Sequence, residues 1–259
     1  MLRKRIIFSL IYCDGYFSQS RNFRLQRVGD LIWLNKNYNF RNIASSIDEL
    51  IVLNASREHK NIKEFSSIVN KLVNEVFIPI ASGGGIKNIE DAELLFKNGS
   101  DKIVLNTLLI ENPNMVNSMV KQFGSQSILA SIDCKFNGKD YDIYVRDGTE
   151  KVDFKLENYI TYLEDLGVGE IYLNSIDKDG TGFGFDNALI SKINFLTKVP
   201  LIIAGGAGNE NHLSVGLRID NVNAVATANL FNFIGDGLPI ARKKIIESGE
   251  NIANWNVIN

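Results

Sequence analysis

Short runs of apolar residues alternate along the chain with longer stretches in which apolar residues recur every three or four positions. The longer stretches, such as Ile62–Asn74 and Ala188–Leu196, predict amphipathic helices, and the short runs predict buried strands. Eight strands are predicted: Arg5–Tyr12, Glu49–Asn54, Val76–Ser82, Lys102–Thr107, Ser127–Asp133, Glu170–Ser175, Pro200–Ala204 and Ala224–Ala228. Because apolar strands that alternate with helices form a parallel sheet covered on its outside, the pattern predicts an α/β fold, a single (β/α)8 TIM barrel.

The bulk properties agree with one such barrel. The chain has 259 residues, 45% of them hydrophobic and 22% charged, and no linker or low-complexity segment divides it. The formal net charge of -2, without a basic stripe, argues against a nucleic-acid partner. No segment approaches the length of a membrane span, so we expect a cytoplasmic protein with no membrane partner. Alternating apolar residues within Gly138–Lys151 predict a small hairpin inserted after the fifth strand.

No residue pattern indicates a metal or an organic cofactor, and we expect none. Cys13 and Cys134 lie far apart in the sequence, outside any metal-ligand spacing, and we expect two reduced thiols. His59 and His212 also lack partners at such a spacing, so we expect them to be ordinary polar surface residues.

The chain contains an internal repeat. In Phe77–Asn88 and again in Val199–Asn209, which begin 121 to 122 positions apart, a short apolar strand containing a proline runs into a glycine turn and then into a helix start. Further matches at the same step predict that the barrel consists of two half-barrels, at about residues 1–124 and 125–259.

Both glycine turns follow predicted strands, and in a TIM barrel the chemistry lies where strands end and loops begin. Glycine lets the backbone approach an anion closely, so the two turns are candidate phosphate sites. The candidate phosphate- or substrate-binding residues are Gly84, Gly85, Asn106 and Thr107 at the first turn, Gly205, Gly206, Ala228 and Asn229 at the second, and Asn174, Asp179, Gly180 and Thr181 around the end of the sixth strand. A substrate with a phosphate at each end would fit, as would a nucleotide sugar or a single phosphate with the other turn idle. The Asp179 segment can also be read as a simple Asp-Gly turn.

The chain resembles the cyclase subunit of imidazole glycerol phosphate synthase, the HisF family, over nearly its whole length. The segments that resemble it are Arg3–Ile7, Val76–Pro79, Gly83–Ile86, Phe123–Gln126, Gly169–Ile171, Asp177–Thr181 and Gly205–Asn209. The resemblance implies a heterodimer with a HisH-like glutaminase, which docks at the amino-terminal face of the barrel. It also implies that ammonia passes through the barrel to a phosphorylated substrate at the opposite mouth.

The resemblance implies an ammonia gate formed by Arg5, Glu49, Lys102 and Glu170. Each of the four begins a predicted strand, and two cations can neutralise two anions in a ring. A structural plug that closes the barrel floor is the alternative interpretation. Asp101 matches a position that contacts the glutaminase, although an exposed corner between helix and strand would look the same.

The candidate acid-base pair is incomplete. The resemblance implies two carboxylates at opposite sides of the mouth, and Asp133 at the end of the fifth strand is one of them. Its mate in the repeat is Ile11, which cannot transfer a proton. Asp14 stands three residues further on, but with Gly15 it is better read as a turn pair. Gln19 stands where the resemblance implies a phosphate-contacting lysine.

Loss of one carboxylate and one cation from the same loop predicts a barrel that retains ammonia delivery and has changed its acceptor. In this respect the chain resembles a divergent branch of the family, in which a HisF-like barrel, a glutaminase and a sugar amidotransferase convert an N-acetyl group to an acetamidino group. This resemblance implies acetamidino modification of a sugar in lipopolysaccharide or flagellar glycan biosynthesis. One alternative is the cyclase of histidine biosynthesis, which forms imidazole glycerol phosphate and the aminoimidazole carboxamide ribonucleotide. Another is a non-catalytic scaffold that activates a glutaminase, although such a scaffold would not need Asp133 or the glycine turns.

Overall fold

The computed structural model describes residues 3–38, 40–57 and 60–255, with residues 41 and 42 described for the backbone alone. His59 therefore lies outside the described residues. Eight parallel strands form a closed barrel: β1 (Arg5–Cys13), β4 (Glu49–Asn54), β5 (Ile80–Gly83), β6 (Lys102–Leu105), β7 (Ile128–Phe136), β10 (Glu170–Ser175), β11 (Leu201–Ala204) and β12 (Val222–Thr227). Each strand pairs with the next in this order, and β12 pairs with β1 to close the ring. The predicted TIM barrel is confirmed.

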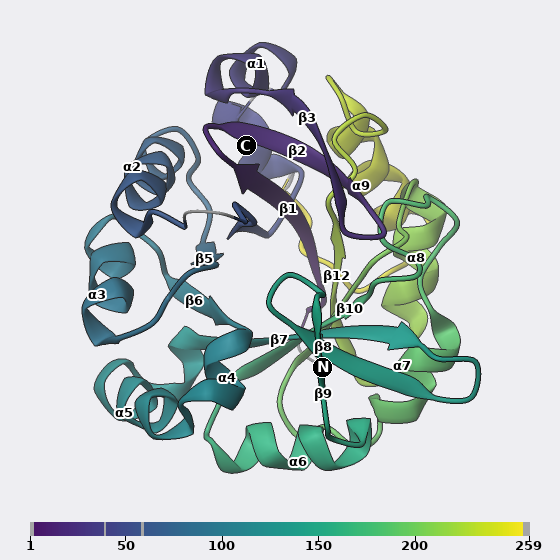
Figure 1. Ribbon diagram of the computed structural model, residues 1–259. Coiled ribbons are helices and arrows are strands. Elements are labelled where there is room, and N and C mark those ends of the chain that lie inside the picture. The colour runs from purple at the N-terminus through teal and green to yellow at the C-terminus, as the bar shows by residue number, and fades with distance from the viewer. Residues whose placement is uncertain (1–2, 39, 58–59, 256–259) are drawn as a thin grey trace.

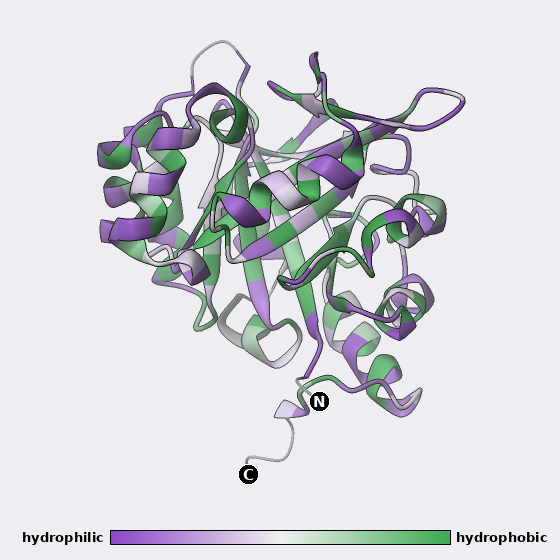
Figure 2. Cartoon of the chain, turned by 90° about the horizontal axis from the view of Figure 1, so that it is seen from below, coloured by the Kyte–Doolittle hydropathy of each residue, from purple (hydrophilic) through white to green (hydrophobic). Residues whose placement is uncertain are grey.

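Helices surround the barrel (Figure 1). They are α1 (Leu31–Asn37), α2 (Ile62–Val73), α3 (Ile89–Lys97), α4 (Thr107–Glu111), α5 (Pro113–Phe123), α6 (Leu156–Asp165), α7 (Asn187–Ile193), α8 (Glu210–Arg218) and α9 (Gly237–Glu247), with 3-10 turns at Phe40–Ser45 and Ser125–Ser127. Figure 2 shows hydrophilic residues on their outer faces and hydrophobic residues along the strands. Among the described residues, no helix is both long and apolar enough to cross a bilayer.

Helix α2 illustrates how the sequence produces this arrangement. The Asn61 side chain accepts the backbone N–H groups of Lys63 and Glu64, which begins the helix at the residue that the sequence predicts. Phe65 and Val69, four residues apart, then lie on one buried face against the barrel. The sequence pattern is therefore sufficient to place α2.

Some predicted boundaries are wrong. Strand β5 begins at Ile80 rather than Val76, because Pro79 has no N–H to donate to the sheet and Phe77 is exposed. Strand β7 continues three residues beyond Asp133, because its end pairs with an added strand. Helix α7 ends at Ile193 and does not reach Leu196.

Two hairpins extend over the carboxyl end of the barrel (Figure 1). The predicted hairpin is present as β8 (Tyr141–Val145) and β9 (Glu150–Val152), with β8 antiparallel to β7. A second hairpin, β2 (Tyr16–Arg21) and β3 (Arg24–Gly29), pairs with β1 and was not predicted. Asp14 and Gly15 form the turn between β1 and β2, both with positive φ (49° and 86°), so their interpretation as a turn is correct.

Besides its backbone pairing with β7, the β8 strand has a buried hydroxyl that contacts the barrel. Tyr141 Oη donates to Asp186 Oδ1 at 2.8 Å, and the other oxygen of Asp186 accepts the Ser175 hydroxyl at 3.0 Å. We expect Tyr141→Phe to lower the free energy of unfolding by about 1.5 kcal/mol, because a hydrogen bond to a charged, buried acceptor is lost. Urea denaturation measures this change. The matched Tyr144→Phe, on the opposite face of β8, is expected to change stability by less than about 0.5 kcal/mol, and equal losses in both variants would contradict a stabilising role of the Tyr141 hydroxyl.

The barrel interior is a separate apolar layer from the one between strands and helices. It consists of Ile7, Ile51, Leu53, Ala81, Val104, Leu129, Tyr172, Ile202, Ala204, Ala224 and Ala226. All of these except the partly buried Leu53 are buried. The interior is therefore an apolar column between the charged residues at its amino-terminal end and the polar mouth at its carboxyl end.

Candidate functional site

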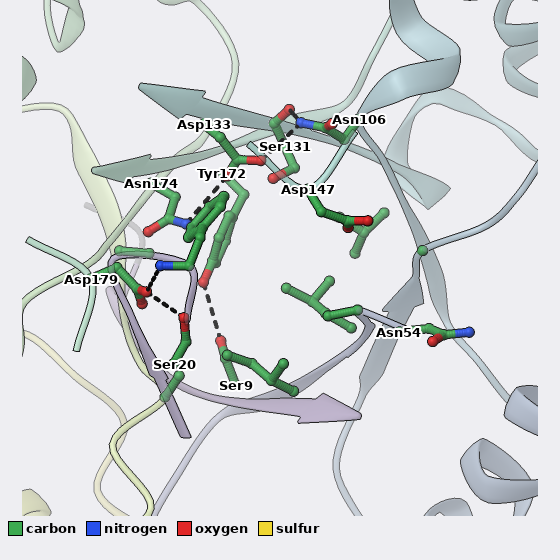
Figure 3. A pocket seen from close by; sticks show the side chains of 18 of the residues that line it. Ser9, Ser20, Asn54, Asn106, Ser131, Asp133, Asp147, Tyr172, Asn174 and Asp179 are labelled. Atoms are coloured by element: carbon green, nitrogen blue, oxygen red, sulfur yellow. Dashed lines mark hydrogen bonds between the residues drawn. The ribbon is translucent and has the colours of Figure 1, made fainter. Parts of the chain in front are cut away.

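A cavity of about 830 Å³ opens at the carboxyl ends of the barrel strands. Both glycine turns line it, together with side chains from both hairpins (Figure 3). Of the predicted site residues, the cavity is lined by Gly84, Gly85, Asn106, Thr107, Asp133, Asn174, Asp179, Gly180, Gly205, Gly206, Ala228 and Asn229. The fold thus brings together residues as far apart in the sequence as Gly84 and Asn229, which are separated by 145 positions. Thr181 does not line the cavity; its hydroxyl donates to the carbonyl oxygen of Lys178 at 2.8 Å.

Asp133 ends the barrel portion of β7 and its carboxyl group lies between two amides. Asn106 Nδ2 donates to Asp133 Oδ2 at 3.1 Å, and Asn174 Nδ2 donates to Asp133 Oδ1 at 3.2 Å. Burial raises the pKa of the Asp133 carboxyl to about 7, against the smaller opposing effect of the Asn174 hydrogen bond. Because this pKa is close to neutrality, the group can accept and return a proton under ordinary conditions.

The opposite side of the mouth is apolar at the corresponding position. In the sheet, Asp133 pairs with Asn174, and on the other side of the barrel Ile11 of β1 pairs with Leu53 of β4. Ile11 and Leu53 both line the cavity. The mouth therefore has a carboxyl group and an amide on one side and two hydrophobic side chains on the opposite side.

The first glycine turn packs directly against neighbouring strands. Gly84 and Gly85 have φ of 100° and 90°, and a Cβ on Gly84 would lie 2.2 Å from the Asn54 carbonyl oxygen. A side chain at Gly84 is therefore excluded. At the start of α4, the Thr107 hydroxyl accepts the Arg146 backbone N–H at 3.1 Å.

The second glycine turn is held by the loop that follows β10. Gly206 has φ of 107°, its carbonyl oxygen accepts the Gly184 N–H at 2.8 Å, and a Cβ on Gly206 would lie 2.0 Å from the Gly184 carbonyl oxygen. Gln19 reaches the same side of the cavity from β2, where its Oε1 accepts the Leu230 N–H at 2.9 Å. The predicted lysine position is thus occupied by a neutral side chain bonded to the backbone.

Asp179 connects the loop after β10 to the first hairpin. Its Oδ2 accepts the Ser20 hydroxyl at 2.5 Å and the Phe23 backbone N–H at 3.0 Å. Burial raises the pKa of the Asp179 carboxyl. The next residue, Gly180, could not carry a Cβ, which would lie 1.9 Å from the Ser20 carbonyl oxygen. This segment therefore positions the hairpin over the mouth as well as lining the cavity.

Sequence reasoning missed several polar residues of the cavity. Lys60 Nζ and Asp147 Oδ1 form an ion pair at 2.6 Å, and Asp147 lies near Asp133 in Figure 3. Deeper in the barrel, the hydroxyls of Ser9 and Tyr172 are 3.4 Å apart. The predicted hairpin could have drawn attention to Asp147 at its tip, but the direction in which the tip points depends on tertiary packing.

A closed ring of charges lies at the amino-terminal end of the barrel. Lys102 Nζ is 2.9 Å from Glu49 Oε1 and 2.8 Å from Glu170 Oε2. Arg5 bonds the same two carboxylates, Glu49 at 2.6 Å and Glu170. Burial opposes the charged form of Arg5, but Glu170 and Glu49 outweigh it and raise its pKa. The four residues predicted to form a gate are therefore in mutual contact.

The remaining predicted residues lie away from the cavity. Asp101 is exposed immediately before β6, and its carboxylate accepts the Ile80 N–H at 2.8 Å. His212 is half-buried in α8 rather than free on the surface, since its Nδ1 accepts the Gly208 N–H at 3.2 Å. Among the described residues, no three His, Cys, Asp or Glu side chains gather as metal ligands would.

This geometry defines a TIM-barrel protein with a polar cavity at the carboxyl end of the barrel, lined by the buried carboxyl groups of Asp133 and Asp179. A family model described as "Histidine biosynthesis protein" matches residues 20–234. A protein from Parasynechococcus marenigrum, named "Putative imidazole glycerol phosphate synthase subunit hisF2", is 44% identical over 100% of this chain and 97% of its own length. Proteins named imidazole glycerol phosphate synthase subunit HisF from Prosthecochloris aestuarii and Dictyoglomus thermophilum are 34% and 35% identical, each over 96% of this chain and 98% of their own. The chain belongs to the HisF family.

Proposed function

We propose that this chain is a cytoplasmic HisF-type subunit that receives ammonia from a glutaminase partner and delivers it through the barrel for acetamidino modification of a surface-glycan sugar. The glutaminase docks at the amino-terminal face, beside Asp101 and the ring of Arg5, Glu49, Lys102 and Glu170. The bond-forming step on the sugar belongs to a separate amidotransferase. Support comes from the relatives, which are named as imidazole glycerol phosphate synthase subunits. It also comes from the ring of charged residues at the amino-terminal end of the barrel and from the cavity at its carboxyl end.

The apolar column above the ring suits neutral ammonia. Its walls include Ile7, Leu129 and Ile202, all essentially unexposed. Burying an unpaired ammonium ion there would cost several kcal/mol, whereas a small neutral molecule avoids that cost. Passage requires one ion pair of the ring to move, and the side chains of Arg5 and Lys102, at 26% and 20% exposure, are more accessible than those of Glu49 and Glu170.

The observation that most favours a changed acceptor is the apolar pair Ile11 and Leu53 opposite Asp133 and Asn174. A ring closure that moves protons onto one nitrogen and off another benefits from an acid and a base on either side of the substrate. Delivery of ammonia to an acceptor has no such requirement for a second carboxyl group at position 11.

Cyclisation in histidine biosynthesis is the second candidate. It is favoured by Asp133, whose raised pKa suits proton transfer, and by the two glycine turns that open onto one cavity. A test incubates the purified chain with the histidine-pathway ribulosyl substrate and ammonium salt at pH about 8.5. Turnover of about 1 per second or faster would establish the cyclase and overturn our proposal. Absence of turnover, with a glutaminase still bound and activated, supports ammonia delivery to another acceptor.

Ile11→Asp tests directly whether the missing carboxyl group limits cyclisation. If it does, the variant gains cyclase turnover by about 100-fold or more over the native chain, the usual contribution of a positioned acid or base. Ile11→Asn is the matched control, because its side chain has the same size and polarity but cannot transfer a proton. Equal turnover in both variants would show that the missing carboxyl group at position 11 does not limit cyclisation.

A further inference from the structure

The Tyr172 side chain lies across the interior of the barrel. Tyr172 belongs to β10 and Ser9 to β1, and β11 and β12 separate these two strands in the sheet. Their hydroxyl oxygens are nevertheless 3.4 Å apart, so the phenol ring extends from one wall of the barrel toward the other (Figure 3). Both residues are buried and both line the cavity. The phenol ring therefore forms part of the cavity floor.

The strands between β10 and β1 leave room for this phenol ring. β11 contributes Ala204 to the barrel interior, and β12 contributes Ala224 and Ala226. Tyr172 is the largest of the apolar residues of the interior, which is otherwise made of aliphatic side chains. Because protein interiors are close-packed, a large side chain is accommodated only beside small ones. The phenol ring thus fills the space that the three alanines leave open.

The register of the strands sets the height of Tyr172 in the barrel. On β10, side chains of one face recur every two residues, so Glu170, Tyr172 and Asn174 follow one another along the barrel interior. Glu170 belongs to the ring of charges and pairs with Leu129 of β7, whereas Asn174 lies at the mouth and pairs with Asp133. Leu129 is therefore on the amino-terminal side of Tyr172, and Asp133 is on the cavity side. The apolar column ends at Tyr172.

The Tyr172 hydroxyl is suited to bind a small neutral molecule that leaves the column. Burial raises the pKa of this hydroxyl, so the group stays protonated at neutral pH and well above it. Its distance of 3.4 Å from the Ser9 oxygen is longer than the usual O–H···O distance of about 2.7 Å, so the contact between the two is weak. Neutral ammonia can accept the tyrosine O–H and donate to the serine oxygen. An ammonium ion has no lone pair with which to accept.

We propose that Tyr172 is an inner gate of the ammonia path. Its phenol ring closes the carboxyl end of the apolar column against water and the acceptor, and it turns aside as ammonia passes. The hydroxyls of Tyr172 and Ser9 bind neutral ammonia between them and do not bind ammonium in this way. This inference rests on the proposed function for the passage of ammonia, and it adds the residue that controls release into the cavity.

Thiol labelling of the full chain tests whether the phenol ring is a barrier. Leu129→Cys places a thiol on the column side of Tyr172, and methyl methanethiosulfonate from the cavity has to pass the phenol ring to reach it. Combined with this change, Tyr172→Leu is expected to speed labelling about 10-fold or more, whereas Tyr172→Phe, which keeps a ring, changes the rate by less than about threefold. Cys134, buried outside the barrel interior, reports general opening of the fold. Equal rates at position 129 with Tyr172 and with Tyr172→Leu would overturn the gate, as would a rise that Cys134 shares in equal measure.

NMR of the full chain with 13C-labelled tyrosine tests the hydroxyl, with ammonium chloride at pH about 9 as the probe. The Cζ resonance that is missing from Tyr172→Phe is assigned to Tyr172. We expect it to shift with a half-maximum at about 0.1 M neutral ammonia or below, and Ser9→Ala to weaken this binding about fivefold, the effect of one lost hydrogen bond. Tyr159, a buried tyrosine outside the barrel interior, is the internal control and does not shift. Tetramethylammonium chloride, which has no lone pair, leaves both resonances unchanged.

Absence of a saturable shift at Tyr172 up to about 0.5 M neutral ammonia, or an equal shift at Tyr159, would overturn the ammonia site. Both experiments use the chain without a glutaminase or an acceptor. Their failure is therefore distinguishable from failure of the proposed function, which is tested by the coupling of glutamine-dependent to ammonia-dependent turnover.

Discussion

Asp133→Asn is expected to abolish any ammonia-dependent chemistry of the barrel while making the fold more stable above pH 7. Burial raises the pKa of this carboxyl from 3.8 to about 7, so the ionised form is disfavoured in the folded chain. An acidic group whose pKa is raised by folding does not destabilise the folded state at a pH below the pKa that it has in the unfolded chain. At a pH above the pKa that it has in the folded chain, it destabilises the folded state by the full amount. The difference between the two pKa values corresponds to about 4 kcal/mol in the free energy of unfolding. We expect the asparagine variant to be more stable than the native chain by about 2 kcal/mol above pH 7.

Urea denaturation of the two proteins at several pH values measures this gain. It should be near zero at pH 4, grow between pH 4 and 7, and be constant above that range. Equal stability of the two proteins at pH 8 would show that the carboxyl group is not penalised by burial.

The activity of the same variant is the second readout. The assay uses whichever acceptor the native chain is active on. We expect the rate of the native chain, divided by the concentration of free ammonia, to change near pH 7. We expect the rate of the Asp133→Asn variant to be about 1,000-fold lower than that of the native chain. Expressing the rate per free ammonia matters because the ammonia concentration itself rises with pH. Asp142→Asn, on the outer hairpin, is the control and retains native activity. Full activity of Asp133→Asn would favour the scaffold interpretation.

Lys102→Ala is expected to uncouple glutamine-dependent from ammonia-dependent turnover. Without Lys102, Glu49 and Glu170 remain buried with Arg5 as their partner, so the ring loses its closed geometry. Breaking a buried pair also destabilises the fold by about 3–5 kcal/mol. With a glutaminase bound, we expect the ratio of product to glutamate formed to fall by about 10-fold or more, while turnover with added ammonium salt is retained.

Two further variants separate gating from folding. Lys102→Arg retains the charge and should restore most of the coupling. Lys97→Ala removes an exposed lysine on a neighbouring helix and should leave both coupling and stability unchanged. If Lys102→Ala keeps native coupling, the ring is a structural plug and the proposed ammonia path is wrong.

Much of the fold follows from local sequence signals. Apolar runs such as Leu50–Leu53 leave no polar face for solvent, which places them in a covered parallel sheet. Asn61 begins α2 by accepting two backbone N–H groups, a local interaction that the sequence reveals. The hairpin after β7 was also evident, because Tyr141, Ile143 and Val145 alternate with polar residues. The division into half-barrels stays a prediction.

The first hairpin was missed because its pattern is weak. Strand β3 has exposed and half-buried positions without a clean alternation, and it is held by contacts that are distant in sequence. Asp179 secures its turn through Ser20 and Phe23, more than 150 residues away. A contact of this kind contributes nothing to local periodicity, so only the folded chain reveals it.

The sequence by itself determined the eight strands, the two glycine turns and the acidic residue at the end of the fifth strand. Only the tertiary structure decided how these groups act on one another. Burial between Asn106 and Asn174 moves the pKa of Asp133 toward neutrality. Barrel closure joins Lys60 to Asp147 across the mouth. The physical reason is that strand identity depends on neighbours along the chain, whereas desolvation and ion pairing depend on neighbours in space, which the closed barrel alone brings together.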